Sequence, residues 1–271
     1  MNPASERPLQ RTQGAGHIAV ALRGGQTRLV RLREEGAAKL RLPRCSGPAA
    51  EAVLINTAGG LTDGDHLRWQ AESGPGSALV LTTQACEKVY RAAGPPARLD
   101  VRLVARTGSR LLWLPQETIL FDRASLHRTL RVDVAGDATF AACEAVLLGR
   151  LAMGERVATL DFRDEWRVRV DGRLVHAENL ALDGPTLAHP AVLDGNAAFA
   201  SLLVVGPQAE ALLLPAREIV GPSGAASFVQ VAGRDKLVVR LAAPDGLVLR
   251  QRLAPLVALL QGGRVPRVWM V

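Results

Sequence analysis

Ala97-Arg-Leu-Asp-Val-Arg-Leu-Val-Ala105 alternates apolar and charged residues almost from end to end. A β-strand points successive side chains to opposite faces, so this pattern predicts a strand with one buried and one solvated face. The same alternation returns at residues 67–71, 130–134 and 162–170. The chain is therefore expected to consist mainly of half-buried strands.

Other stretches are apolar almost throughout, which is typical of strands covered on both faces. They lie at residues 51–55, 78–81, 109–114 and 200–205. Glycine and proline turn signals recur about every ten residues, and Asp171-Gly172 is a tight-turn signal between two strands. This spacing favours a large β-sandwich, barrel or β-helix over alternating βαβ units.

Two segments have a helical pattern. The first is residues 207–217, which has proline in its first turn. The second is residues 248–261, where a glycine pair follows the last turn and one face carries Leu249, Leu253, Leu256 and Leu260. Proline lacks a backbone N–H, so Pro255 is expected to kink or interrupt this second helix.

The composition bounds the class of protein. Residues 1–15 are polar and are expected to be a disordered tail, followed by a single β-rich domain at residues 16–271. Aromatic residues make up only 4% of the chain, so the core should be aliphatic. The tail has no apolar signal-peptide segment, and no apolar run is long enough to span a membrane. Three widely spaced cysteines, Cys45, Cys86 and Cys143, suit a reducing cytoplasm.

The formal net charge is +7. A basic chain can bind nucleic acid, but these arginines alternate with acidic residues, and few aromatic side chains are available for stacking on bases. An acidic protein partner fits the charge at least as well. We therefore expect neither a nucleic acid nor a membrane as partner.

The segment Asn56–Asp65 combines three glycines with two aspartates between apolar runs. Gly59, Gly60 and Gly64 allow sharp backbone bends, and Asp65 suits a turn at a strand junction. A calcium loop needs more ligands than Asp63 and Asp65 supply, so no stable metal site is expected. A brief contact with a passing cation remains an alternative.

Glu117 and Glu144 each interrupt an apolar stretch. A buried carboxylate is costly unless it is paired or hydrogen-bonded. The simpler interpretation is pairing with an arginine such as Arg150. The other is that both carboxylates line an internal polar passage. Cys143 should point to the opposite strand face from Glu144.

Motifs for catalysis are absent from the sequence. It has no Gly-x-Ser-x-Gly nucleophile elbow and no glycine-rich phosphate-binding loop. We therefore expect no enzymatic activity, no catalytic residue and no tightly bound cofactor, and a bound nucleotide would belong to a partner.

Five motifs, in order, resemble the urease accessory protein D family, also called the H protein. They are Asn56–Thr62 with Gly64 and Asp65; Leu81–Gln84 with Glu87–Arg91; Leu114–Ile119 with Phe121 and Asp122; Glu144 with Leu148–Arg150 and Gly154–Glu155; and Pro266-Arg267 with Trp269. The resemblance extends from about residue 16 to the end of the chain. Asp63 departs from it, since relatives more often have glycine there.

The resemblance implies an all-β fold, a two-layered right-handed β-helix with two helices. It also implies a non-catalytic urease maturation factor that docks on urease apoprotein. Through the F-type accessory protein it would recruit the G-type GTPase, which carries the GTP, and nickel would pass through on its way to the enzyme. We expect a wet channel lined by Thr82, Thr83, Glu117, Asp122 and Glu144. Residues Leu249 to Leu260 of the last helix are the expected contact for the F-type protein.

Two other classes of function stay open on the sequence. A carbohydrate-active β-helix enzyme would need two acids within glycosidic reach in an exposed cleft. A basic nucleic-acid-binding scaffold would show salt-dependent binding to DNA.

Overall fold

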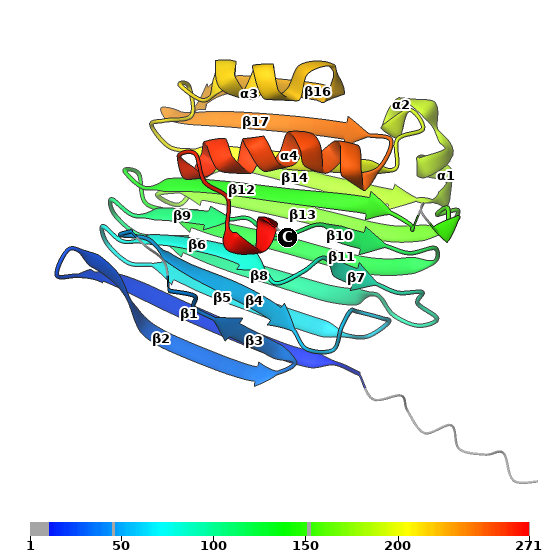
Figure 1. The fold of residues 1–271 in the computed structure, drawn as a ribbon, viewed down its shortest axis with the longest axis horizontal. Coiled ribbons are helices and arrows are strands. Elements are labelled where there is room, and N and C mark those ends of the chain that lie inside the picture. The colour runs from blue at the N-terminus through cyan, green and yellow to red at the C-terminus, as the bar shows by residue number, and fades with distance from the viewer. Residues whose placement is uncertain (1–10, 45–46, 151–152, 271) are drawn as a thin grey trace, which may run out of the picture.

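A computed structural model describes residues 11–44, 47–150 and 153–270. The molecule is 54% strand and 16% helix and forms a β-solenoid of about 4 turns. Two sheets lie face to face, with the two longer helices on one side of them and two short helices at one end of the strands (Figure 1). The expected all-β, two-layered β-helix is confirmed.

The first sheet has seven strands. In spatial order they are β14 (Arg173–Asp183), β13 (Leu160–Val170), β11 (Ala124–Val134), β8 (Ala97–Ala105), β5 (His66–Ser73), β1 (Gln13–Arg23) and β2 (Gln26–Gly36). The second sheet has ten strands. Eight follow the order β16 (Gly224–Val231), β17 (Arg234–Ala243), β15 (Ala198–Val205), β12 (Thr139–Leu148), β9 (Arg110–Trp113), β6 (Ala78–Thr83), β4 (Ala50–Asn56) and β3 (Ala38–Arg41). The short strands β7 (Glu87–Val89) and β10 (Thr118–Leu120) pair with each other, and β10 also pairs with β12.

The chain makes each turn of the solenoid by passing from one sheet to the other. Each turn has one strand in each sheet, and the successive turns are β4 with β5, β6 with β8, β9 with β11, and β12 with β13. Strands that occupy the same place in successive turns pair in parallel. Antiparallel strands close both ends: β2 and β3 at one, and β14, β15, β17 and β16 at the other. The parallel register holds every inward-facing position in line from turn to turn, and it thereby stacks the core.

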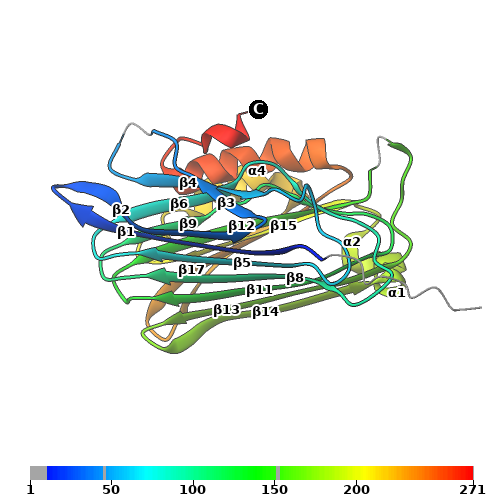
Figure 2. The same cartoon turned by 90° about the horizontal axis from the view of Figure 1, so that it is seen from below.

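The two sheets bury their strands differently, as the sequence patterns predict. In the seven-stranded sheet β8 and β13 alternate between buried residues and residues that are partly or fully exposed, because the outer face of the sheet meets solvent. In the ten-stranded sheet β6, β9 and β15 are buried on both faces. The covering elements are α3 (Leu213–Val220) and α4 (Gly246–Gln261), which pack on its outer side (Figure 2).

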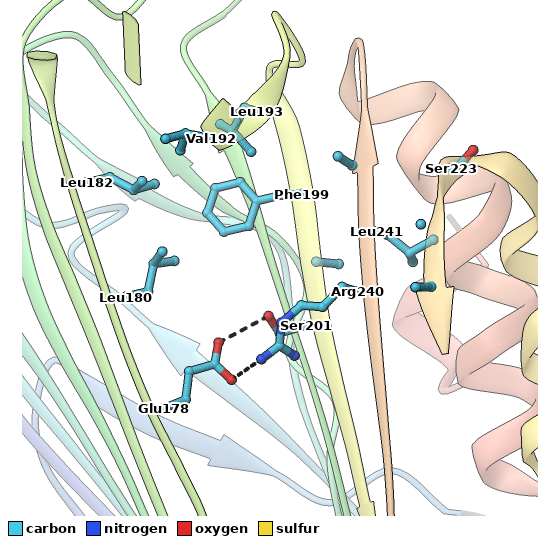
Figure 3. A pocket seen from close by; sticks show the side chains of 14 residues that line it. Glu178, Leu180, Leu182, Val192, Leu193, Phe199, Ser201, Ser223, Arg240 and Leu241 are labelled. Carbon is cyan, nitrogen blue, oxygen red and sulfur yellow. Dashed lines mark hydrogen bonds and ion pairs between the residues drawn. The ribbon is translucent and has the colours of Figure 1, made fainter. Parts of the chain in front are cut away.

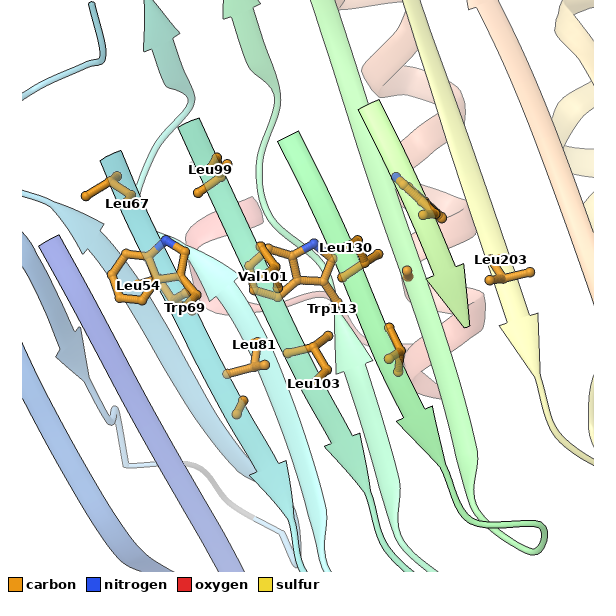
Figure 4. Close-up of a cluster of buried hydrophobic side chains, with 14 of the residues drawn as sticks. Leu54, Leu67, Trp69, Leu81, Leu99, Val101, Leu103, Trp113, Leu130 and Leu203 are labelled. Carbon is orange, nitrogen blue, oxygen red and sulfur yellow. The ribbon is translucent and has the colours of Figure 1, made fainter. Parts of the chain in front are cut away.

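The space between the sheets holds an aliphatic core with a few large rings. Trp69 and Trp113 lie among leucines and valines from both sheets (Figure 4). Leu81 and Leu103 are at most 1% exposed. Burial of such side chains contributes about 1.5–3 kcal/mol each, so this layer supplies most of the stability.

The helices differ from the sequence prediction in number and bounds. Residues 207–212 form turns, and α3 begins at Leu213 instead. Helix α4 continues through Pro255 without interruption; this residue is exposed, so its ring faces solvent. Two short helices were not predicted: α1 (Gly184–Ala188) and α2 (Pro190–Leu193). They are too short for a helical period to show.

Two short 3-10 turns lie at Gly221–Ser223 and Arg267–Trp269. Strand β1 begins at Gln13, inside the expected tail of residues 1–15, because its backbone pairs with β2 and β5. Residues 1–10 of that tail lie outside the described residues. No helix within the described parts of the chain has the length and apolarity needed to cross a membrane.

The hairpin between β13 and β14 turns at Asp171-Gly172, as predicted, with φ of 47° and 80°. A side chain larger than hydrogen at the second position is strained in this left-handed region by about 1–2 kcal/mol. Gly172→Val should therefore lower the free energy of unfolding by about that amount in urea denaturation. Arg173→Val, next to the turn but in strand β14, should change it by much less.

Candidate functional site

A buried charge cluster joins the two sheets at the middle of the solenoid. Arg128 of β11 is 3% exposed, and its Nε donates to Asp164 Oδ1 at 3.0 Å. Its Nη2 donates to the other oxygen of Asp164, and its Nη1 donates to Glu144 of β12 in the opposite sheet. Trp113 Nε1 donates to Glu144 at 2.7 Å, and Trp166 Nε1 donates to Asp164 at 3.1 Å. Every charge in the cluster is therefore paired and hydrogen-bonded.

Two carboxylates share this one guanidinium, so the cluster has more acidic groups than basic ones. Burial raises the pKa of Glu144, an effect that Arg128 opposes and Asp164 reinforces. Asp164 receives two bonds from the guanidinium, whereas Glu144 receives one. Glu144 is therefore the less firmly held of the two carboxylates.

Glu117 faces the other way, toward α4. Arg250 of α4 places Nη1 2.8 and 2.9 Å from its two carboxylate oxygens. Cys86 Sγ donates to Glu117 at 3.4 Å. Arg250 also stacks over the Trp269 ring, 4.9 Å from its centroid. Glu117, only 2% exposed, is thus enclosed by the helix and the C-terminal segment.

The expected partner of these two carboxylates is corrected. Arg150 pairs with Glu155 instead, at 2.9 Å, and its guanidinium lies 4.6 Å from the centre of the Phe121 ring. Arg150 follows β12 in a surface turn, so it cannot reach either the space between the sheets or the underside of α4. Cys143 does point away from Glu144, into the core beneath α4.

The two threonines of the expected channel lie near Glu117. Thr82 is fully buried and accepts a hydrogen bond from Trp269 Nε1 at 3.2 Å. Thr83 Oγ1 accepts from the backbone N–H of Gln116 at 2.9 Å and donates to Ala85 O. Adjacent strand residues point to opposite faces, so the two hydroxyls border different spaces.

Asp122 lies apart from the other channel candidates. Its Oδ1 accepts from the backbone N–H groups of Ala158 and Thr159 at 2.8 and 2.9 Å. These bonds hold the pKa of Asp122 below its usual range. Asp122 therefore caps a surface turn. The five candidates divide into Thr82, Thr83 and Glu117 near α4, Glu144 between the sheets, and Asp122 at the rim.

The loop at Asn56–Asp65 is held by its own polar side chains. Asp65 is 4% exposed and accepts from the backbone N–H groups of Thr12 and Thr62. Gly59, Gly60 and Gly64 have φ of 76°, 152° and 74°, the region that favours glycine. A Cβ at Gly60 would lie 2.4 Å from the Tyr90 ring.

This loop also places an amide beside Glu87, which belongs to the second motif but was not among the expected channel residues. Asn56 Nδ2 donates to Glu87 Oε1 at 3.0 Å. Burial raises the pKa of Glu87 to about 7, and Asp65 adds to this, while Asn56 opposes it. A cleft of about 180 Å³ is lined by Asn56, Thr83, Cys86 and Glu87 among others. Through Cys86 this cleft adjoins Glu117.

The four leucines expected to contact a partner are buried in the protein itself. Leu249, Leu253, Leu256 and Leu260 are 0–7% exposed and pack against the ten-stranded sheet. A helix on a sheet buries its most apolar face, so that face is not free for another protein. Leu247, 71% exposed, is a residue of α4 that does reach solvent.

The described residues include no group of three or more histidine, cysteine or acidic side chains arranged to hold a metal ion. Burial, with Glu117 close by, raises the pKa of Cys86 to about 11. Burial also raises the pKa of Cys143 well above its usual value. The thiolate is the form that binds metals, so neither thiol is a ready ligand at neutral pH.

A separate, largely apolar cleft opens between β14 and β15, with α2 at one end (Figure 3). Its lining includes a single carboxylate, Glu178, which Arg240 pairs with and to which Ser201 Oγ donates at 3.5 Å. A glycosidase needs two acids facing the sugar. This cleft does not provide them.

The fold and these clusters define a β-solenoid scaffold with a paired charge cluster between its two sheets. The chain matches the family model described as UreD urease accessory protein over residues 12–270. Relatives named urease accessory protein UreD include those of Chelativorans sp. strain BNC1, 51% identical over 99% of this chain and 97% of the relative, and of Agrobacterium fabrum strain C58, 53% identical over 96% and 92%. The same protein of Brucella suis strain ATCC 23445 is 49% identical over 97% and 96%.

The chain therefore belongs to the UreD family of urease accessory proteins. This membership implies a role in urease maturation.

Arg128→Met should lower the free energy of unfolding by about 3–5 kcal/mol, because it leaves Glu144 and Asp164 buried without a cation. Chemical denaturation with the wild-type chain as reference measures this. The triple variant that also carries Glu144→Met and Asp164→Leu should recover most of the loss, since it removes the stranded charges. A single variant as stable as wild type would show that the cluster does not hold the sheets together.

The Glu87 carboxyl binds its proton more tightly in the folded chain than in the unfolded chain, where its pKa is near 4.5. Its contribution to stability should therefore fall as pH rises from about 4.5 to about 7 and stay constant above. The free energy of unfolding of Glu87→Gln, measured by urea denaturation, should rise relative to that of wild type by about 1–3 kcal/mol between pH 5 and pH 8. Glu155→Gln is the control, because Arg150 lowers the pKa of Glu155, so this substitution should not gain on wild type as the pH rises.

Proposed function

We propose that this protein is a non-catalytic maturation factor that docks on urease apoprotein. Together with the F-type accessory protein and the G-type GTPase it assists the insertion of nickel into the active site. The GTP belongs to the G-type protein, and nickel is cargo in transit and not a resident cofactor. Family membership supports the maturation role, and the arrangement of oxygen ligands near α4 supports the passage of nickel.

The observation that carries the passage is the position of Glu117. It lies beneath α4 and touches Cys86, which lines the cleft that also holds Thr83 and Glu87. Carboxylate and hydroxyl oxygens bind Ni²⁺ more weakly than thiolates and imidazoles do. A path built from them lets an ion move on, as delivery requires.

The arginine pairs are consistent with a cation that passes without being kept. Glu117 is held by Arg250, so an entering Ni²⁺ must compete with a guanidinium already in place. A divalent cation carries twice the charge and competes locally, but the arginine returns once the ion leaves. We assign Thr83, Glu87 and Glu117 to the passage. Glu144 lies in the separate cluster between the sheets, and Asp122 caps a surface turn.

Urease activation reconstituted from purified components tests the proposal. Apoprotein, the F-type and G-type proteins, GTP and Ni²⁺ should yield urea hydrolysis when this chain is added and little when it is omitted. Glu117→Gln should lower the rate of activation by about tenfold or more, because it removes the charge that attracts the cation. Co-purification of this variant with its partners should be unchanged.

Glu155→Gln is the matched control, since it removes an ion-paired carboxylate at a surface turn. It should leave activation at the wild-type rate. Equal activation by Glu117→Gln and wild type would remove Glu117 from the passage. Full activation without this chain, or failure to bind urease apoprotein, would contradict the maturation role itself.

A further inference from the structure

A second large cleft lies where the end of α4 meets the ten-stranded sheet. We call it the α4-end cleft; its volume is about 890 Å³. Its lining includes Glu51 of β4, Arg110 of β9 and Gln261 of α4, with Arg264 and Arg267 from the segment after the helix. This size is in the range of sites that enclose a ligand.

Three arginines line this cleft, Arg110 from β9 and the other two from the segment after α4. Arg264 and Arg267 are exposed, and Arg110 is half-buried, with Nη2 donating to Leu260 O. Among the described residues, none of the three lies within 4.0 Å of a carboxylate oxygen, in contrast to the paired Arg128 and Arg250. Burial lowers the pKa of Arg110. The one carboxylate in the lining, Glu51, interacts with Arg267, and the three arginines outnumber it, so the cleft keeps an excess of positive charge.

Two further polar atoms in the lining lack hydrogen-bond partners. They are Glu51 Oε1, an acceptor, and Gln261 Nε2, a donor, and both are buried. A buried polar atom without a partner is unfavourable, so a ligand that supplies the missing bond binds more tightly. Glu51 Oε1 needs a hydrogen-bond donor, and Gln261 Nε2 needs an acceptor.

The combination selects the chemistry of the ligand. Phosphate-ester dianions and simple carboxylates neutralise arginines but offer acceptors alone, and hydrogen phosphate adds a single O–H donor. A peptide backbone offers both N–H and C=O groups, and acidic side chains supply the anions. An acidic peptide therefore meets all five groups at once.

We propose that the α4-end cleft binds an acidic, extended segment of a partner protein. Carboxylates of the segment contact Arg264, Arg267 and Arg110, while its backbone meets Glu51 and Gln261. The proposal deepens the function proposed above and rests on it only for which partner supplies the segment. Binding to the isolated chain does not depend on it.

The test measures binding of a fluorescein-labelled octapeptide of alternating glutamate and alanine to the purified full chain by fluorescence anisotropy. The double variant Arg264→Gln/Arg267→Gln should weaken binding by about tenfold or more, since it removes two charge-assisted hydrogen bonds. Gln261→Ala should weaken it by about threefold, in line with the loss of one neutral hydrogen bond.

The matched control is Arg163→Gln/Arg169→Gln, which makes the same change of charge on the outer face of the seven-stranded sheet. It should leave the affinity within about twofold of wild type, because charges beyond a Debye length are screened. A glutamine–alanine octapeptide should not bind, and citrate or inorganic phosphate should compete only at far higher concentration.

Several results would overturn the proposal: no binding of the glutamate peptide to wild type, equal losses in the two double variants, or displacement by citrate or phosphate at concentrations equal to the peptide. Because no urease component is present, these outcomes are independent of the activation assay. Circular dichroism of each variant checks that the fold is kept.

Discussion

One guanidinium, that of Arg128, bridges the two sheets in the middle of an otherwise aliphatic core. Its two carboxylate partners come from opposite sheets, so the cluster is satisfied only when both sheets stand at the correct distance and in the correct register. A shift of one residue along β11 would turn Arg128 to solvent and strand Glu144 and Asp164 inside. The hydrophobic layer supplies most of the stability, and the charge cluster selects one alignment.

Polar chemistry is otherwise placed outside this layer, beneath α4 and at the ends of the strands. Glu117, Thr83 and Glu87 lie there, and so does the excess positive charge of the α4-end cleft. The ten-stranded sheet is covered by helices, and each gap between helix and sheet is a sheltered place for oxygen and nitrogen ligands. In the described parts of the chain no helix covers the outer face of the seven-stranded sheet at β8 and β13, which carries charged side chains. The two faces thus suit different uses: enclosed polar sites on one, an open surface on the other.

Much of the fold was predictable because a period of two is visible in each strand separately. The helix bounds were less so, since α1 and α2 have five and four residues, and Pro255 was tolerated because it faces solvent. For the site, Glu117 and Glu144 stand out as acids in apolar runs. Their partners were missed, although Arg128 occupies an inward position between Leu126 and Leu130, a signal the alternation already contained.

By itself, the sequence determined the class of fold and the family, because alternation, turn residues and ordered motifs are local properties. It also established that buried carboxylates need partners. Only the tertiary structure decided which partners these are, because Arg250 is 133 residues from Glu117 and meets it through the packing of α4. In the same way the structure turned Leu249 and its neighbours inward, since a helix must bury its apolar face against the sheet that it covers.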